Sequence, residues 1–137
     1  MGHETIRRVL SVEDEPTIMK LLEHVVNAFG GEHQGFNYGG DFQRHSPYNA
    51  AEVKLITCDG NFPWEMGGSP VLNMHRVVGE ARRMYGKVPI IGYTGSLDNE
   101  KDKDQLIQLL KPYDNVTLIS KAEPKKMIAA VRNILSS

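Results

Sequence analysis

The chain alternates five times between a short apolar run and an amphipathic helical stripe, and this alternation limits the folds open to it. The apolar runs are rich in β-branched and aliphatic residues, and the stripes place apolar residues three and four positions apart. Such an alternation predicts an α/β domain whose parallel sheet is covered by helices on both faces. A length of 137 residues, 40% of them hydrophobic, suits one globular domain.

The expected elements can be placed from these patterns and from turn residues. The stretch 31–51 is glycine-rich and has weak periodicity, so its strand and its short, irregular helix are the least defined. A glycine pair, Gly30-Gly31, is expected to end the first helix, and Ser69-Pro70 to start the third. Strands are expected at Ile6–Val12, His33–Tyr38, Val53–Cys58, Val88–Tyr93 and Val116–Ser120, and helices at Pro16–Phe29, Phe42–Ala51, Pro70–Tyr85, from Asp98 or Asn99 to Leu110, and at Pro124–Leu135.

Composition narrows the classes of function. A net charge of −1 gives no electrostatic reason to expect nucleic acid or an anionic membrane as partner. No apolar run approaches the roughly 18 residues of a membrane span, so a cytoplasmic protein without membrane insertion is expected. Cys58, the only cysteine, lies in an apolar run and is predicted to be a buried, reduced core residue. The domain is expected at 5–137, with 1–4 as a disordered start or an expression scar.

Chemically reactive side chains follow four of the predicted strands. Glu13 and Asp14 follow the first, Asp59 the third, Thr94 the fourth and Lys121 the fifth. Taken singly, these residues are ordinary helix-start acids, turn formers or a solvated lysine. Because ligands of open parallel sheets bind at the carboxyl ends of the strands, their joint placement predicts one shared site.

The chemistry of such a site follows from its charges. Three carboxylates at close range repel one another unless a cation lies among them. Oxygen ligands favour a hard divalent ion, Mg²⁺ or Mn²⁺. Beside that ion and an ammonium group, a carboxylate such as Asp59 can attack phosphorus and become an aspartyl phosphate. The hydroxyl of Thr94 is placed to hydrogen-bond the product.

These segments resemble the receiver domain of two-component response regulators, of the chemotaxis-regulator type, over nearly the whole chain. Val12-Glu13-Asp14-Glu15-Pro16 is similar to the acidic pair of that family. Asp59-Gly60-Asn61-Phe62-Pro63 resembles its phosphoacceptor segment, in which an Asp stands four residues before a Pro. Ile90–Gly95 resembles its fourth strand ending in Thr, and Lys121 resembles its lysine.

The resemblance implies a flavodoxin-like (βα)5 three-layer sandwich with strand order 2-1-3-4-5. It implies a phosphoacceptor and not a turnover enzyme, with a sensor histidine kinase or histidine phosphotransfer protein as donor. A downstream protein target would bind the face made by the fourth and fifth helices. The implied residue roles are Asp59 as phosphoacceptor, Asp14 and Asp59 as direct Mg²⁺ ligands, Glu13 acting mostly through water, Asn61 as a ligand through its backbone carbonyl, Thr94 and Lys121 as phosphate-binding switch residues, and Asn61 and Ser96 as residues that tune the phosphate lifetime.

Two departures from the family pattern concern signal output. The family usually has Lys-Pro, whereas this chain has Lys121-Ala122-Glu123-Pro124. Leu118 stands where the family commonly has an aromatic residue that swings inward upon phosphorylation. The segment 94–98 is therefore the expected switch element.

Two other functions compete with the phosphoacceptor. A phosphatase of the aspartyl-phosphate type would need a second acid two residues after Asp59, and Asn61 occupies that position. A pseudo-receiver that binds partners without phosphorylation would fit the departures at Leu118 and after Lys121. The chain as a single-domain regulator, a phosphorelay intermediate or a fragment of a hybrid kinase also remains open.

Overall fold

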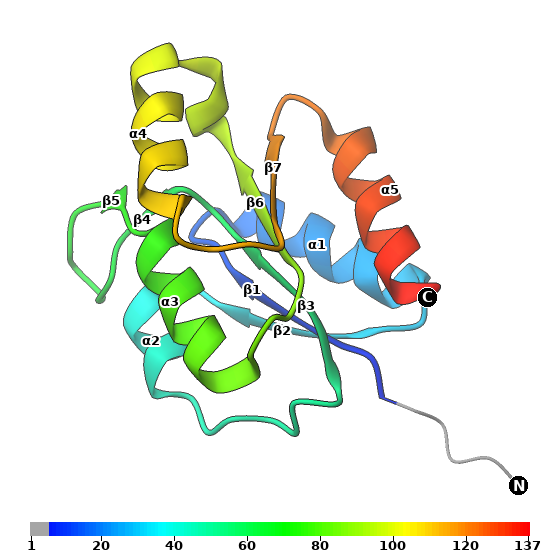
Figure 1. Cartoon of the computed structure of the whole chain (residues 1–137). Helices are drawn as coiled ribbons and strands as arrows, with labels where there is room; N and C mark the ends of the chain where they lie inside the picture. The colour runs from blue at the N-terminus through cyan, green and yellow to red at the C-terminus, as the bar shows by residue number, and fades with distance from the viewer. Residues whose placement is uncertain (1–5) are drawn as a thin grey trace, which may run out of the picture.

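The computed structural model describes residues 6–137, so the expected start at 1–4 lies outside the described residues. A five-stranded parallel sheet of order β2-β1-β3-β6-β7 is flanked by helices on both faces (Figure 1). Counted within this sheet alone, the order is 2-1-3-4-5, which confirms the flavodoxin-like prediction. The elements are β1 (Arg8–Val12), α1 (Pro16–Ala28), β2 (Glu32–Phe36), α2 (Gly39–Arg44), β3 (Val53–Cys58), β4 (Asn61–Phe62), β5 (Val71–Leu72), α3 (Met74–Tyr85), β6 (Ile90–Thr94), the 3₁₀ helix η1 (Gly95–Asp98), α4 (Glu100–Leu110), β7 (Val116–Ser120) and α5 (Pro124–Leu135).

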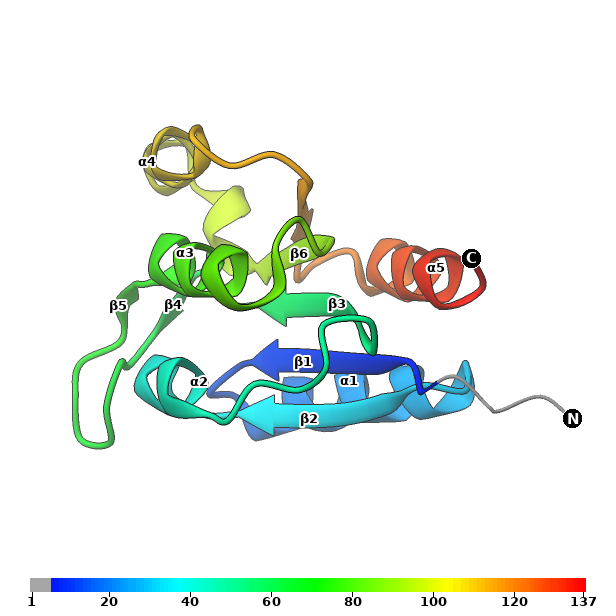
Figure 2. The same cartoon turned by 60° about the horizontal axis from the view of Figure 1, so that its bottom comes forward.

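Two hydrophobic cores lie on opposite faces of the sheet. Helices α1 and α5 cover one face, and α2, α3 and α4 belong to the other (Figure 2). Neighbouring residues of a strand serve different cores, as Val9 and Leu10 do in β1. This two-sided burial explains why the central strands are apolar runs instead of alternating patterns. Cys58 is buried and unpaired, as predicted.

The start predicted for the third helix is wrong. The helix begins at Met74 and not at Pro70, and Val71–Leu72 instead forms β5, antiparallel to β4. Gly67, at φ +82°, lies in the turn that brings the chain back toward β4. Two adjacent apolar residues fit a strand as well as a helix, and pairing with Asn61–Phe62 decides for the strand.

The second helix is also displaced from its predicted range. It spans Gly39–Arg44, and the chain from 45 to 51 is irregular. Pro47 disfavours helical backbone at the residue before it. The phenol of Tyr85 holds this segment, since its oxygen lies 2.7 Å from Nε2 of His45 and accepts the backbone N–H of Tyr48 at 3.1 Å.

Smaller differences affect element ends. The second strand ends at Phe36, and the fourth begins at Ile90 and includes Thr94. Of the two candidate caps for α4, Asn99 serves, because its Oδ1 accepts the N–H of Asp102 at 3.1 Å. Gly30, at φ +79°, follows α1 in the left-handed conformation expected there. No helix within residues 6–137 is long and apolar enough to cross a bilayer.

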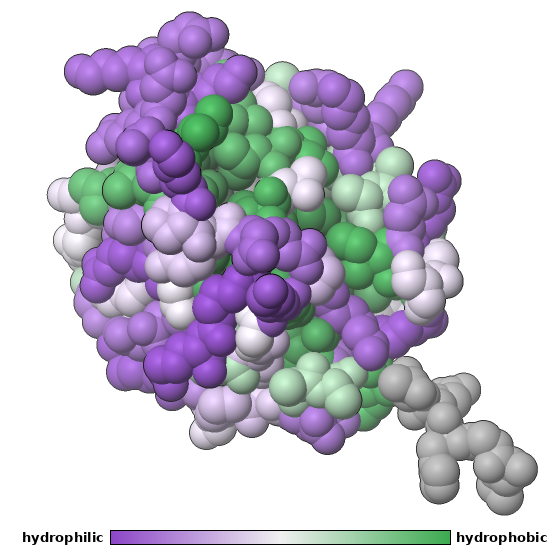
Figure 3. All heavy atoms as spheres, viewed as in Figure 1, coloured by the Kyte–Doolittle hydropathy of each residue, from purple (hydrophilic) through white to green (hydrophobic). Residues whose placement is uncertain are grey.

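Between α4 and α5, Figure 3 shows hydrophobic surface beside β7, the edge strand of the sheet. A shallow hollow of about 270 Å³ lies along the α4 side of this strand. Ile107 on its rim is 46% exposed, and Leu118 of β7 is half-buried in its wall.

Helix α2 packs closely on the segment that follows β4. The N–H groups of Gly39 and Gly40 donate to the carbonyls of Pro63 and Trp64, at 3.3 and 2.7 Å. A Cβ atom at Gly39 would overlap the indole ring of Trp64. This contact therefore requires glycine at position 39.

Gly39→Ala is expected to lower the free energy of unfolding by about 1–3 kcal/mol, because the added methyl group must displace the indole ring. Gly95→Ala is the matched control, since a Cβ there meets no atom within 4 Å. Urea denaturation measures both variants. Equal losses in the two would show that the Gly39–Trp64 contact does not constrain the fold.

Candidate functional site

The strand register brings the predicted site residues to one edge of the sheet. Val12 pairs with Cys58, so the residues that follow them, Glu13 and Asp59, are neighbours. The N–H of Asp59 donates to the carbonyl of Val12 at 3.0 Å. On the other side, the N–H of Lys121 donates to the carbonyl of Thr94 at 3.1 Å. Each side chain is thus fixed by the ladder that precedes it.

Lys121 reaches across the edge to the carboxylates. Its Nζ lies 3.0 Å from Oε1 of Glu13, 3.2 Å from Oδ2 of Asp59 and 3.5 Å from Oε2 of Glu15. The side chain of Glu13 is only 2% exposed and that of Asp59 only 9%, whereas that of Glu15 is 60% exposed. The two buried pairs therefore dominate, since water screens the pair with Glu15.

Burial controls the ionisation of this cluster. Loss of hydration, reinforced by the charge of Asp59, raises the pKa of Glu13 to about 8, although Lys121 opposes the shift. Burial also raises the pKa of Asp59 against the opposing effects of Lys121 and the Gly60 N–H. Burial lowers the pKa of Lys121, but the charges of Asp59 and Glu13 outweigh it and leave that pKa raised. One ammonium is thus too little positive charge for these carboxylates.

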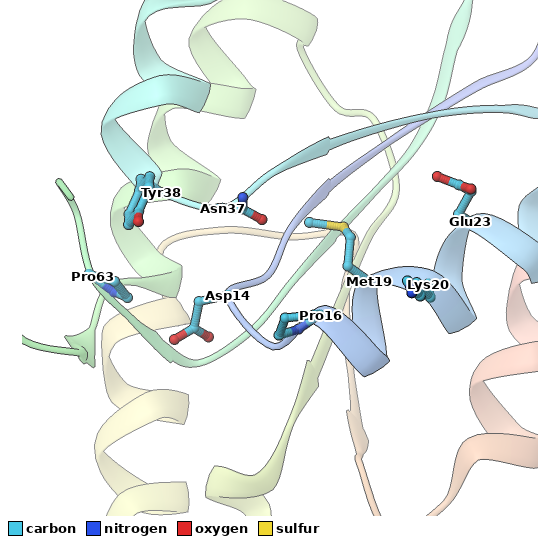
Figure 4. Close-up of a pocket in the computed structure, with 8 residues that line it drawn as sticks. All are labelled: Asp14, Pro16, Met19, Lys20, Glu23, Asn37, Tyr38 and Pro63. Atoms are coloured by element: carbon cyan, nitrogen blue, oxygen red, sulfur yellow. The ribbon is translucent and has the colours of Figure 1, made fainter. Parts of the chain in front are cut away.

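The cluster fits a hard divalent cation. Among residues 6–137, Glu13, Asp14 and Asp59 each offer a carboxylate oxygen, and these oxygens lie within 4.8 Å of one another. Asp14 is partly exposed, which leaves room for the water ligands that Mg²⁺ retains. It also lies at one end of a neighbouring hollow of about 470 Å³, between Pro16 and Pro63 (Figure 4).

The phosphoacceptor candidate opens onto a polar hollow of about 300 Å³, lined also by Asn61, Thr94, Ser96 and Lys121. Oδ1 of Asp59 accepts the N–H of Gly60 at 2.7 Å. The hydroxyl of Thr94 accepts the N–H of Ser96 at 3.0 Å. A Cβ at Gly60 would lie 2.5 Å from that hydroxyl oxygen, so glycine permits the close approach of β6.

The two residues inserted after Lys121, Ala122 and Glu123, do not displace the lysine from the site. The N–H of Ala122 donates to Oγ of Ser120 at 3.1 Å, and Glu123 precedes the first residue of α5.

Three contributions to this edge were not predicted. Glu15 pairs with Lys121, and Asp102 of α4 lines the hollow. Directly beneath the carboxylates lies a polar layer, in which Oγ1 of Thr57 donates to Oγ of Ser11 at 2.6 Å. Nε2 of His33 lies 2.8 Å from the same Ser11 oxygen. This layer could have been predicted from the sequence, because Ser11 and Thr57 stand two residues before Glu13 and Asp59 and therefore on the same faces of their strands.

Comparison with known proteins identifies the fold. No family model matches the sequence. The CAI-1 autoinducer sensor kinase/phosphatase CqsS of Vibrio cholerae is 29% identical over 122 residues, which is 84% of this chain and 17% of that protein. The receiver domain of a Pseudomonas aeruginosa sensor histidine kinase, with a magnesium ion in its active site cleft, aligns with TM-score 0.68 at 20% identity, covering 96% of this chain and 99% of that one.

Two further structures align over nearly their whole length. The Thermotoga maritima response regulator TrrA, in complex with Mg²⁺-BeF, gives TM-score 0.60 at 23% identity and covers 92% of this chain and 99% of its own. The signal receiver domain of an HD domain-containing protein from Pseudomonas fluorescens gives TM-score 0.69 at 13% identity, covering 99% of this chain and 91% of that one. The chain therefore has the fold of response regulator receiver domains.

The raised pKa of Glu13 predicts that the metal-free protein loses stability as pH rises. The ordinary pKa of 4.5 applies to the unfolded chain and about 8 to the folded one, so the folded state binds more protons between these values. We expect the free energy of unfolding to fall from about pH 5 to pH 8, by about 1.4 kcal/mol per unit of pKa difference at most.

Urea denaturation in EDTA across this range measures the loss. Glu13→Gln is expected to flatten the profile, and saturating Mg²⁺ to oppose the loss, whereas Glu100→Gln on exposed α4 should leave it unchanged. A Glu13→Gln profile as steep as that of the wild type would contradict the assignment.

Proposed function

We propose that this chain, over residues 5–137, is a cytoplasmic phosphoacceptor receiver domain that accepts a phosphoryl group from a phosphohistidine onto Asp59, with Mg²⁺ or Mn²⁺. The observation that carries the proposal is the buried carboxylate of Asp59, which lies 3.2 Å from Nζ of Lys121 and forms one cluster with the carboxylates of Glu13 and Asp14. The receiver fold, which belongs to signalling domains, supports it.

In the proposed reaction, a carboxylate oxygen of Asp59 attacks the phosphorus of phosphohistidine. A P–O bond forms, the P–N bond breaks, and the imidazole keeps the electron pair and takes up a proton. The Gly60 N–H donates to Oδ1 of Asp59 and holds it in place. Nζ of Lys121 lies 3.2 Å from Oδ2 of Asp59, close enough to bind the oxygens of a phosphoryl group attached there. The hydroxyl of Thr94 lines the same hollow and can hydrogen-bond the product.

The residues present fit a divalent ion, which supplies positive charge next to the transferring phosphoryl oxygens when it is bound. Asp14 and Asp59 would hold it directly, Asn61 through its backbone carbonyl, and Glu13 mostly through water. The side chains of Asn61 and Ser96 line the hollow in which the aspartyl phosphate would be hydrolysed, which supports their role in setting its lifetime.

The donor is a sensor histidine kinase or a histidine phosphotransfer protein. The similarity to one segment of a sensor kinase supports a partner of that type. A downstream protein would bind the hydrophobic surface along α4 and β7 (Figure 3). On that surface Leu118 is half-buried and Ile107 is exposed, so apolar side chains there are accessible to a partner protein.

Two alternatives remain distinguishable from this function. A pseudo-receiver would bind its partner equally with and without beryllofluoride, a phosphate mimic. A phosphatase would turn over phosphomonoesters, but Asn61 provides no general acid two residues after Asp59, so no turnover of p-nitrophenyl phosphate is expected.

With acetyl phosphate and Mg²⁺, the wild-type protein is expected to gain one phosphoryl group, and Asp59→Asn none, because an amide is not a nucleophile toward phosphorus. Intact-mass spectrometry detects the added group, and EDTA should prevent it. Asp104→Asn, on the exposed side of α4, is the matched control and should behave as the wild type. Equal phosphorylation of Asp59→Asn and wild type would overturn the proposed function.

A further inference from the structure

Asn73 is a buried polar residue at the foot of the hairpin formed by β4 and β5. It is 2% exposed and directly precedes α3, yet its side chain does not cap that helix. Its Nδ2 instead donates to the carbonyl of Phe62 at 2.8 Å, and its backbone N–H donates to the carbonyl of Gly60 at 3.0 Å. One residue therefore holds the carbonyls on both sides of Asn61.

The hydrogen-bond pattern of the hairpin leaves the carbonyl of Asn61 free. Opposite residues in an antiparallel ladder alternate between hydrogen-bonded and non-hydrogen-bonded pairs. Gly60 and Asn73 stand at a hydrogen-bonded position of the ladder, of which the bond from the Asn73 N–H is formed, while the Gly60 N–H donates to Asp59 instead. The next pair in this register, Asn61 and Leu72, is therefore at a non-hydrogen-bonded position. The carbonyl of Asn61 consequently points away from β5 and is not used by the hairpin.

We propose that Asn73 is a positioning residue that holds the main-chain carbonyl of Asn61 in place as a ligand of the divalent ion. The inference rests on the proposed function, because it assigns a role toward the ion of that site. Carboxylate ligands on β1 and β3 are fixed by the sheet, but Asn61 lies beyond β3 and depends on the hairpin. Groups that orient metal ligands through hydrogen bonds commonly contribute to metal affinity in this way.

The surroundings of Asn73 show that the base of the hairpin is built as a fixed support. Phe62 is fully buried, and Trp64 packs on α2 while the guanidinium of Arg76 stacks on its ring at 3.7 Å. The tip is different, since Met66 is 81% exposed. Rigidity is thus concentrated where the Asn61 carbonyl is held.

The test compares Asn73→Ala with Asn115→Ala in the whole chain. Asn115, in the exposed loop before β7, is the control, because its Nδ2 also donates to a loop carbonyl, that of Lys87, at 2.8 Å. Electron paramagnetic resonance measures the binding of Mn²⁺, and amide chemical shifts measure that of Mg²⁺. We expect Asn73→Ala to bind either ion about tenfold more weakly, and Asn115→Ala to bind as the wild type does.

A second variant guards against loss of the fold. Asn73→Ser retains a favourable residue before α3 but cannot reach the carbonyl of Phe62, so the same weakening is expected. At saturating Mg²⁺ both Asn73 variants should approach the wild-type rate of phosphorylation by acetyl phosphate, with a raised half-saturating Mg²⁺ concentration. Wild-type metal affinity in both Asn73 variants would overturn the inference while leaving the proposed function intact. A wild type that neither binds the ions nor accepts phosphate would overturn the proposed function itself.

Discussion

A single lysine shared between two buried carboxylates is the interaction on which this end of the molecule depends. Lys121 follows β7 but pairs with Asp59 after β3 and Glu13 after β1, so its side chain must pass the end of β6. Strand β6 lies between β7 and β3, so the side chains of Lys121, Asp59 and Glu13 meet over the carboxyl end of β6. Strand β6 ends at Thr94, and a Cβ atom at the following Gly95 would meet no atom within 4 Å, so the end of this strand is open.

The incomplete neutralisation of charge gives the site its chemistry. One ammonium faces Glu13, Asp14 and Asp59, and burial denies Glu13 and Asp59 the water that would otherwise stabilise their charges. A second cation relieves this imbalance, whereas an apolar or anionic ligand does not. The polar layer of Ser11 and Thr57 beneath the carboxylates adds hydrogen-bonding groups where the strands would otherwise be apolar. The cluster is therefore suited to a divalent cation.

The sequence predicted what depends on local pattern and missed what depends on distant partners. The apolar runs were enough to place four of the five sheet strands, and the strand in the weakly periodic stretch 31–51 was placed by spacing alone. The chemistry of the strand ends was enough to bring Glu13, Asp59 and Lys121 together. The start of α3 was not predictable in this way, because Val71–Leu72 becomes a strand only through pairing with Asn61–Phe62. Asn73 gave no signal either, since the carbonyl that its side chain binds lies eleven residues away, across the hairpin.

The hydrogen bonds that hold η1 suggest how phosphorylation of Asp59 would change the surface of the protein. The hydroxyl of Thr94 now accepts the N–H of Ser96, and Asp98 at the far end of η1 accepts the hydroxyl of Ser120 at 3.0 Å. A Thr94 hydroxyl drawn toward a phosphoryl oxygen would leave the Ser96 N–H without its acceptor, at the first turn of η1. Because α4 begins directly after Asn99, an adjustment of η1 would act on α4 at its first residue, and the carboxyl-terminal half of the same helix lines the hydrophobic surface beside β7. Such a route needs no aromatic residue at position 118.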